Sequence, residues 1–270
     1  MSQQNEAGPV ADEQPFPSVR EVDAAAPLRW VSRGFADLRA CPIPSLFYGF
    51  CFAAMGLLVT MVFEHAYEYT AALTSGFLLL GPFLAMGLYE ISRRHELGQS
   101  CELRPTLTVW TRNAGNIGIF AVVLGIVFLV WARASLVVFA LFYTNELPNL
   151  SGFLTQLLAL ENIEFLLVYF SVGMLFATIV FAASVISVPL MLDRNQDAIT
   201  SMLASIGALA RNPGPMLVWA ILIVALTIVG FLSFHLGLVV LMPVVGHASW
   251  HAYRDLVAPV TEPSATLKRP

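Results

Sequence analysis

The chain has 270 residues, of which 57% are hydrophobic and 12% are charged, and its mean hydropathy is +0.74. Soluble proteins carry about 25% charged residues, so this composition excludes an ordinary water-soluble domain. The net charge of -4 comes without any dense basic stripe, which excludes nucleic acid as a partner.

The N-terminal stretch 1–28 is rich in Pro, Ala, Glu and Gln, and it carries Asp12 and Glu13 where a signal peptide would carry basic residues. We expect a disordered cytoplasmic tail there. A membrane domain is predicted over 29–257, followed by a cytoplasmic C-terminal tail over 258–270. The three cysteines have no CxxC spacing, so we expect free thiols in a reducing compartment for Cys41, Cys51 and Cys101.

Apolar stretches long enough to cross a membrane follow the tail. A bilayer core about 30 Å thick takes about 20 apolar residues per helix. The stretch from Met216 to Trp250 is long enough for two helices, with a turn near Ser233 to Leu236. The sequence therefore predicts an all-α, polytopic membrane helix bundle with six transmembrane helices, at 43–63, 71–91, 116–135, 166–190 and in the two halves of 216–250.

The cations fix the orientation of these spans. With six spans, every Lys and Arg except Arg133 falls on one side, and the loops on the other side are acidic or neutral. This asymmetry is the positive-inside pattern, so both termini are predicted to be cytoplasmic, with anionic lipids as partners at that face. Arg133 is expected to reach headgroups at the outer end of the third span, before an interfacial outer loop at 134–160 that contains a short amphipathic helix.

Two cytoplasmic entries resemble each other, DLRACPIPSLFYG at 37–49 and ALARNPGPMLVWA at 208–220. Each has an amphipathic helix before a PxP break, and we expect these helices to lie along the inner leaflet. The even-numbered spans each carry one proline, which should kink the helix and free a carbonyl group. Three related helical hairpins would explain the pattern, and convergence on the same interface chemistry would explain it too; the prolines are Pro82, Pro189 and Pro243.

Near the C-terminus, GHASWHAYRD at 246–255 is the first candidate site. His247 and His251 are four residues apart and share a helix face, so they could ligate a metal or haem iron, with Asp255 as an acceptor behind one imidazole. No third ligand is evident, so no metal and no cofactor is predicted. The alternative is anchoring at the inner interface by the aromatic and charged residues of this segment, Arg254 included.

A second candidate, GPFLAMGLYEISRRHELG at 81–98, places Glu90 one turn before Arg93 and Arg94. This spacing predicts intrahelical ion pairs, and Gly98 is expected to end the helix. The alternative is an arginine clamp for lipid phosphates, which Arg104 and Arg112 would strengthen.

The third candidate lies in 187–215, where Asp193 and Arg194 leave the fourth span. Asp193 is expected to cap the following helix, with Asp197 in its first turn. A ligand or switching role for Asp193 and Arg194 is the alternative. Small residues four apart also permit close helix contacts, at Gly49 and Ala53, Gly173 and Ala177, and Ala248 and Ala252.

The three candidate segments, in this order and spacing, resemble the signature blocks of a bacterial family of predicted integral membrane proteins, domain of unknown function 2189. The resemblance extends from about Trp30 to Val257. It implies a bacterial cytoplasmic (inner) membrane location and supports six spans, but it implies no activity.

Function is predicted from physical features alone. The sequence contains no portable catalytic motif, so we do not expect an enzyme. A non-catalytic accessory or scaffold subunit, with a membrane-protein partner, is the first hypothesis. A small-molecule or lipid permease is the alternative, and a redox- or haem-associated protein is the third.

Overall fold

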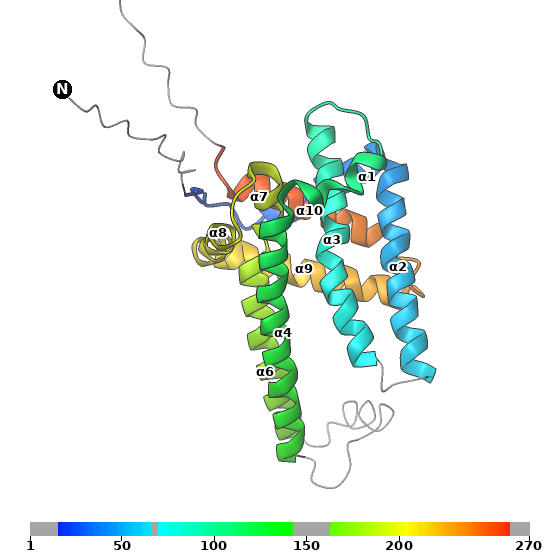
Figure 1. Ribbon diagram of the computed structural model, residues 1–270, viewed down its shortest axis with the longest axis vertical. Helices are drawn as coiled ribbons and strands as arrows, with labels where there is room; N and C mark the ends of the chain where they lie inside the picture. Colours follow the sequence, from blue (N-terminus) through cyan, green and yellow to red (C-terminus); the bar gives the residue numbers. More distant parts are fainter. Residues whose placement is uncertain (1–15, 66–69, 143–162, 260–270) are drawn as a thin grey trace, which may run out of the picture.

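The computed structural model describes residues 16–65, 70–142 and 163–259, and of residues 63–65, 70–80 and 82 it describes the backbone only. The regular structure in this part of the chain is helical, apart from a single bridge between Val19 and Val257. The long helices are shown in Figure 1. They are α1 (Ala26–Ala40), α2 (Pro42–His65), α3 (Thr70–Glu96), α4 (Ala114–Phe142), α6 (Ile163–Ser184), α7 (Ser187–Arg194), α8 (Ala198–Arg211), α9 (Pro213–Leu232) and α10 (Leu238–Leu256), with short 3-10 helices η2 (Arg104–Thr106) and η3 (Val109–Asn113) after α3.

The predicted helices and their breaks are largely found. Each PxP segment begins a new helix, α2 at Pro42 and α9 at Pro213. Only Cys41 separates α1 from α2, and only Asn212 separates α8 from α9. The long apolar stretch near the C-terminus turns between Leu232 and Leu238, where the sequence predicted a turn. The all-helical fold class is therefore confirmed.

Fewer membrane spans are found in the described part of the chain than the six predicted. Among the described residues, four helical stretches are long and apolar enough to cross a membrane: Pro42–Val62, Arg104–Phe142, Ile163–Arg194 and Pro213–Leu232. Helix α10 does not qualify, because its C-terminal half is polar and carries His247, His251, Arg254 and Asp255. The structure thus supports a membrane protein with several apolar helices, and six spans are not established by it.

Two predicted spans differ in length or continuity. Helix α4 has 29 residues, about 43 Å at 1.5 Å per residue, so the loop predicted at 134–160 begins later than expected, and its predicted amphipathic helix lies outside the described residues. Arg133 is exposed on α4, well before the helix ends. The fourth predicted span is broken between α6 and α7, just ahead of Pro189, whose ring would clash with the carbonyl group four residues earlier.

Helix α10 is the central element of the fold. It packs against α1, α2, α3 and α9, and twelve of its residues are buried. Pro243 lies inside it and has no N–H, so the carbonyl group of Val239 has no helical donor. Gly49 of α2 lies directly against this carbonyl: a Cβ atom there would be 1.9 Å from the Val239 oxygen and 3.0 Å from Cγ of Pro243. A Cα–H group therefore faces the carbonyl that the proline frees.

A second close approach joins α10 to α1. A Cβ atom at Gly34 would lie 2.6 Å from the Val244 oxygen and 3.3 Å from Cβ of Ala248. Ala248 and Ala252 are both fully buried. Of the predicted small-residue pairs, those beginning at Gly49 and Ala248 lie at close helix contacts, whereas nothing lies near Gly173.

The chain ahead of α1 lies against the end of α10. Val22 donates its backbone N–H to Oδ1 of Asn212 at 2.8 Å, and the Arg20 guanidinium donates to the Arg254 carbonyl at 2.6 Å. Asn212, which is buried, donates in turn to the Arg20 carbonyl at 3.0 Å. Residues 16–28, assigned to the tail from the sequence, are therefore placed by hydrogen bonds between α8 and α10.

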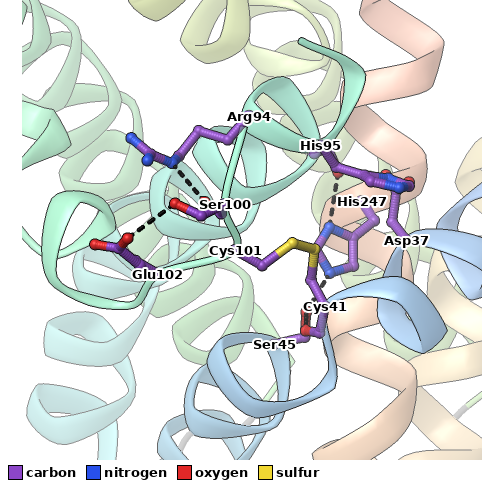
Figure 2. Close-up of a disulfide and its surroundings, with 10 residues drawn as sticks. Asp37, Cys41, Ser45, Arg94, His95, Ser100, Cys101, Glu102 and His247 are labelled. Atoms are coloured by element: carbon purple, nitrogen blue, oxygen red, sulfur yellow. Dashed lines mark hydrogen bonds and ion pairs between the residues drawn. A yellow bond between two sulfur atoms is a disulfide. The ribbon is translucent and has the colours of Figure 1, made fainter. Parts of the chain in front are cut away.

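Cys41 and Cys101 form a disulfide, which corrects the expectation that all three cysteines are free (Figure 2). Gly98 has φ +66°, and the N–H of Gln99 donates to the Arg94 carbonyl at 2.9 Å, so α3 ends in the predicted glycine cap. The chain then turns back over the junction of α1 and α2, where the two Cα atoms are 5.5 Å apart. Cys51 is free.

Helix α8 buries small residues and exposes large apolar ones. Its inner face carries small residues such as Ala204 and Ala208, while Ile199, Leu203 and Ile206 are about half exposed. Asp197 caps the helix by accepting the Thr200 N–H at 2.8 Å. The prediction that Asp193 provides this cap is wrong, because α7 continues through Asp193 and ends at Asn195 in the left-handed conformation.

The helices do not all share one direction. In Figure 1, α2, α3, α4 and α6 are seen lengthwise, α8 is seen end-on, and α9 runs across α4 and α6. An apolar surface on a helix that lies across the long helices is the geometry expected of α8 at a membrane interface. Helix α9 therefore differs in direction from α4 and α6.

The contact at Gly49 gives a first prediction. Replacing Gly49 with Ala should destabilise the protein by about 1–3 kcal/mol, because the new methyl group would force α2 away from the Val239 carbonyl. Gly118 of α4 is the matched control, since nothing lies within 4 Å of its Cβ position. Thermal unfolding in detergent should show a lower Tm for Gly49→Ala and an unchanged or higher Tm for Gly118→Ala. Equal stability of both variants would contradict the close contact.

Candidate functional site

His247 of α10 is fully buried between two serines from other helices. Its Nε2 atom lies 2.9 Å from Oγ of Ser45 on α2, and its Nδ1 atom lies 2.8 Å from Oγ of Ser92 on α3. The Ser45 hydroxyl also donates to the Cys41 carbonyl at 2.7 Å. Three helices are therefore joined by one imidazole.

Both nitrogens of His247 are engaged within the fold. The Ser92 hydroxyl on its Nδ1 side is also hydrogen-bonded to the Asp37 carboxylate. Because His247 is fully buried and a serine lies against each ring nitrogen, neither nitrogen is free to bind a metal or haem iron.

Asp37 of α1 bridges two further histidines. One carboxylate oxygen lies 2.8 Å from Nδ1 of His95, and the other lies 2.9 Å from Nε2 of His251. Figure 2 shows Asp37 beside His95 and close to His247. Burial raises the pKa of the Asp37 carboxyl, but the hydrogen bonds from His251, Ser92 and His95 outweigh it and lower this pKa from 3.8 to about 2.

Glu90 of α3 holds three arginines, although its own side chain is only 1% exposed. Arg112 from η3 makes two parallel hydrogen bonds to it, at 2.8 and 2.9 Å. The predicted intrahelical pairs are present at longer distances, 3.5 Å for Arg93 and 4.0 Å for Arg94. The guanidinium groups proposed as a phosphate clamp are thus engaged with a buried carboxylate.

A second set of ion pairs joins α7 to α3 and α10. Asp193 lies 3.3 Å from Arg93 and 3.6 Å from Arg254, and it accepts the Tyr253 hydroxyl at 2.6 Å. Arg254 also pairs with Glu96 at 2.9 Å, and Glu96 accepts the indole N–H of Trp250 at 3.0 Å.

The remaining two candidates have structural partners. Asp255 accepts the indole N–H of Trp30 at 2.8 Å and pairs with Arg33 at 3.1 Å. No hydrogen bond joins Asp255 to His247 or His251, so it is not the predicted acceptor behind one of these imidazoles; for His251 the acceptor is Asp37. Arg194 donates to the Ala258 carbonyl.

All nine candidate side chains lie at one end of the helices, where α3, α7 and α10 meet. Among the described residues, no group of three or more His, Cys, Asp or Glu side chains could hold a metal ion. Five partner residues were not predicted from the sequence: Asp37, Ser45, Ser92, His95 and Glu96. One signal was available for Asp37, because Trp30, Gly34 and Asp37 recur at helical spacing on one face, which puts a carboxylate on a buried stripe.

These features define the class of the molecule. It is an integral membrane protein with several apolar helices, joined at one end by buried hydrogen bonds and ion pairs. Residues 70–193 match the model of a family described as predicted integral membrane protein, domain of unknown function 2189. The resemblance predicted from the sequence is thereby confirmed for this segment, from α3 to α7. No curated protein and no solved structure matches the chain.

Asp37 gives a prediction with a pH dependence. Asp37→Asn should lower the free energy of unfolding by about 2–3 kcal/mol near neutral pH, because two imidazole donors lose their charged acceptor. The pKa of this carboxyl is lower in the folded protein, so its contribution is complete above pH 4 and is lost as the pH falls toward 2. The stability difference between the two proteins should therefore shrink over this range.

Chemical denaturation in detergent at several pH values measures this difference. Asp23→Asn is the matched control, because the Asp23 carboxylate is exposed and pairs with Arg29 at the surface. We expect little change for this control. A difference that stayed constant from pH 6 to pH 2 would show that Asp37 does not stabilise the fold through its charge.

Proposed function

We propose that the protein is a non-catalytic accessory or scaffold subunit of a membrane complex in the bacterial inner membrane. The observation that carries this proposal is that the candidate polar groups bind one another across helices. Glu90, Asp193 and Asp255 each accept from arginine, tyrosine or tryptophan donors. Groups used in this way position helices, and a rigid helical body is what a scaffold requires.

The surface for a partner is the hairpin of α4 and α6. These helices pack mainly on each other and on η3, α7 and α8, and in Figure 1 they stand apart from α2 and α3. Their outer faces are apolar and exposed, with Leu129 at 64%, Leu167 at 63% and Met174 at 68%. A helix of another membrane protein would find apolar contacts along this surface.

For the membrane placement we propose six spans with cytoplasmic termini. The arginines of the ion-pair networks lie together at one end of the helices, as the positive-inside rule requires of a cytoplasmic face. Half-exposed guanidinium groups such as those of Arg33 and Arg112 would meet anionic lipids there. Cys41 and Cys101 would lie at the cytoplasmic face in this orientation. Their disulfide would therefore be exposed to a compartment that keeps most thiols reduced.

A small-molecule or lipid permease is the second candidate, and one observation favours it. A cavity of about 620 Å³ lies between α3, α4, α6, α9 and α10, and α10 contains a proline within the helix. The redox or haem hypothesis has less support, because both imidazole nitrogens of His247 are engaged by serines.

The accessory role predicts a stoichiometric protein partner. We expect native mass spectrometry of the tagged protein, extracted from its own membranes in mild detergent, to show one. A photocrosslinking amino acid at Leu167 should capture that same partner, and one at Ile43, exposed on α2, is the control position. A protein that is always purified alone and crosslinks only to lipid would contradict the proposal.

The orientation predicts which introduced thiols a membrane-impermeant maleimide can reach in intact cells. Leu236→Cys, in the exposed turn before α10, should be labelled, whereas Gln99→Cys, in the exposed loop after α3, should not. The unchanged chain reports any labelling of the natural cysteines. Labelling of Gln99→Cys, or protection of Leu236→Cys until the cells are opened, would overturn the six-span topology.

A further inference from the structure

The cavity between α3, α4, α6, α9 and α10 has no part in the proposed scaffold role. Its volume is about 620 Å³, within the range of small-molecule sites. Its walls come from α3, α4, α6, α9 and α10, with Phe52 from α2, and no charged residue is among the lining residues. The site therefore excludes an ionic ligand by its own composition, because a bare charge there would be desolvated without a partner.

The cavity is elongated along the helices. On α4 it is lined from Ile117 through Leu124 to Trp131, at intervals of two helical turns. Fourteen residues of α-helix correspond to about 21 Å. On α6 the lining extends from Gly173 to Ser184, about 16 Å by the same measure. A narrow apolar space of this length fits a hydrocarbon chain.

Polar groups occur mainly at the end of the cavity nearest the ion-pair networks. Tyr89, Ser184, Ser249 and Trp219 line this end, close to the ends of α3, α6, α10 and α9 respectively. The two serine hydroxyls donate to carbonyl groups of their own helices, Ser184 at 2.6 Å and Ser249 at 2.8 Å. Neither serine therefore has a free proton, and the Ser249 hydroxyl also shares a hydrogen bond with Tyr89.

Trp219 is different. It is fully buried, and its indole N–H is the one buried side-chain polar atom in the described part of the chain that has no hydrogen-bond partner. Its ring packs edge-to-face with Trp30 at 5.7 Å. The indole nitrogen has almost no accessible surface in the ligand-free molecule, so a ligand oxygen would reach it only after a small movement of the wall. A buried donor without an acceptor costs about 1–3 kcal/mol, and such a contact would recover that energy.

The apolar walls also limit the occupant of the cavity. Water is disfavoured because the walls are apolar. A single lipid chain remains as the occupant whose shape and chemistry agree with the site.

We propose that this cavity binds a neutral, lipid-like molecule, with its hydrocarbon chain along α4 and α6 and a carbonyl or ester oxygen accepting the Trp219 indole N–H. The uncharged head would lie among Tyr89, Ser184 and Ser249, below the arginine networks. This site is separate from the outer surface of α4 and α6 proposed for a protein partner. A missing protein partner would leave it unaffected.

The test uses the full chain, freed of native lipid and reconstituted in detergent, with a monoacylglycerol that carries a photoactivatable diazirine near its chain end. Its head is uncharged and its ester oxygen is an acceptor. We expect crosslinks at lining residues within 117–131 or 173–184. Trp219→Phe keeps an aromatic ring but removes the donor, and it should weaken binding about 2- to 10-fold. Trp110→Phe, on exposed Trp110 of η3, should leave it unchanged.

Two further variants fill the cavity. Ala177→Trp and Ala121→Leu each add volume to a lining position and should abolish crosslinking inside it; having two keeps the test valid if one fails to fold, which thermal unfolding reports. Crosslinks confined to outward positions such as Leu129, or cavity crosslinks that persist in a folded filled variant, would overturn the proposal. So would an unchanged affinity of Trp219→Phe, or better competition by the charged lysophosphatidylglycerol.

Discussion

The close approach of α10 to α1 and α2 is the constraint on which the rest of the structure depends. It requires glycine at Gly34 and Gly49, because carbonyl groups of α10 occupy the space of their missing side chains. At this separation the short side chain of Ser45 on α2 reaches Nε2 of His247, while Ser92 reaches Nδ1 from α3. The ion pairs then fix the relative positions of α3, α7 and α10. Buried pairs of this kind contribute little net stability, since desolvation offsets their attraction, but a single broken pair is costly.

Much of the helical framework follows from local patterns in the sequence. Apolar length predicted the approximate positions of the long helices, and the starts of α2 and α9 were predicted within three residues. The pairing of Glu90 with Arg93 and Arg94 and the glycine cap at Gly98 are also local, since they depend on residues fewer than six apart. Such features need no knowledge of the tertiary fold.

The parts that could not be predicted are contacts between distant segments. His251 is bound by Asp37, 214 residues away, and not by the nearby Asp255, whose partners Trp30 and Arg33 are on α1. The same holds for Cys41 and Cys101, which are joined only because the chain after α3 folds back. The number of spans is hard to predict for a related reason. Polar residues of α10 are buried and paired with other residues, and a hydropathy average does not account for such pairing.

The position of α10 also bears on the order in which the molecule assembles. Chains fold from the N-terminus as they are synthesised, yet the helix that α1, α2 and α3 all pack against is the last to be made. Until residue 256 has left the ribosome, Ser45 and Ser92 lack His247, Asp37 has His95 but lacks His251, and the glycine faces of α1 and α2 have nothing to cover them. Assembly is therefore completed only after synthesis, and a nascent chain interrupted before α10 exposes unpaired polar groups that quality-control proteases of the membrane can recognise.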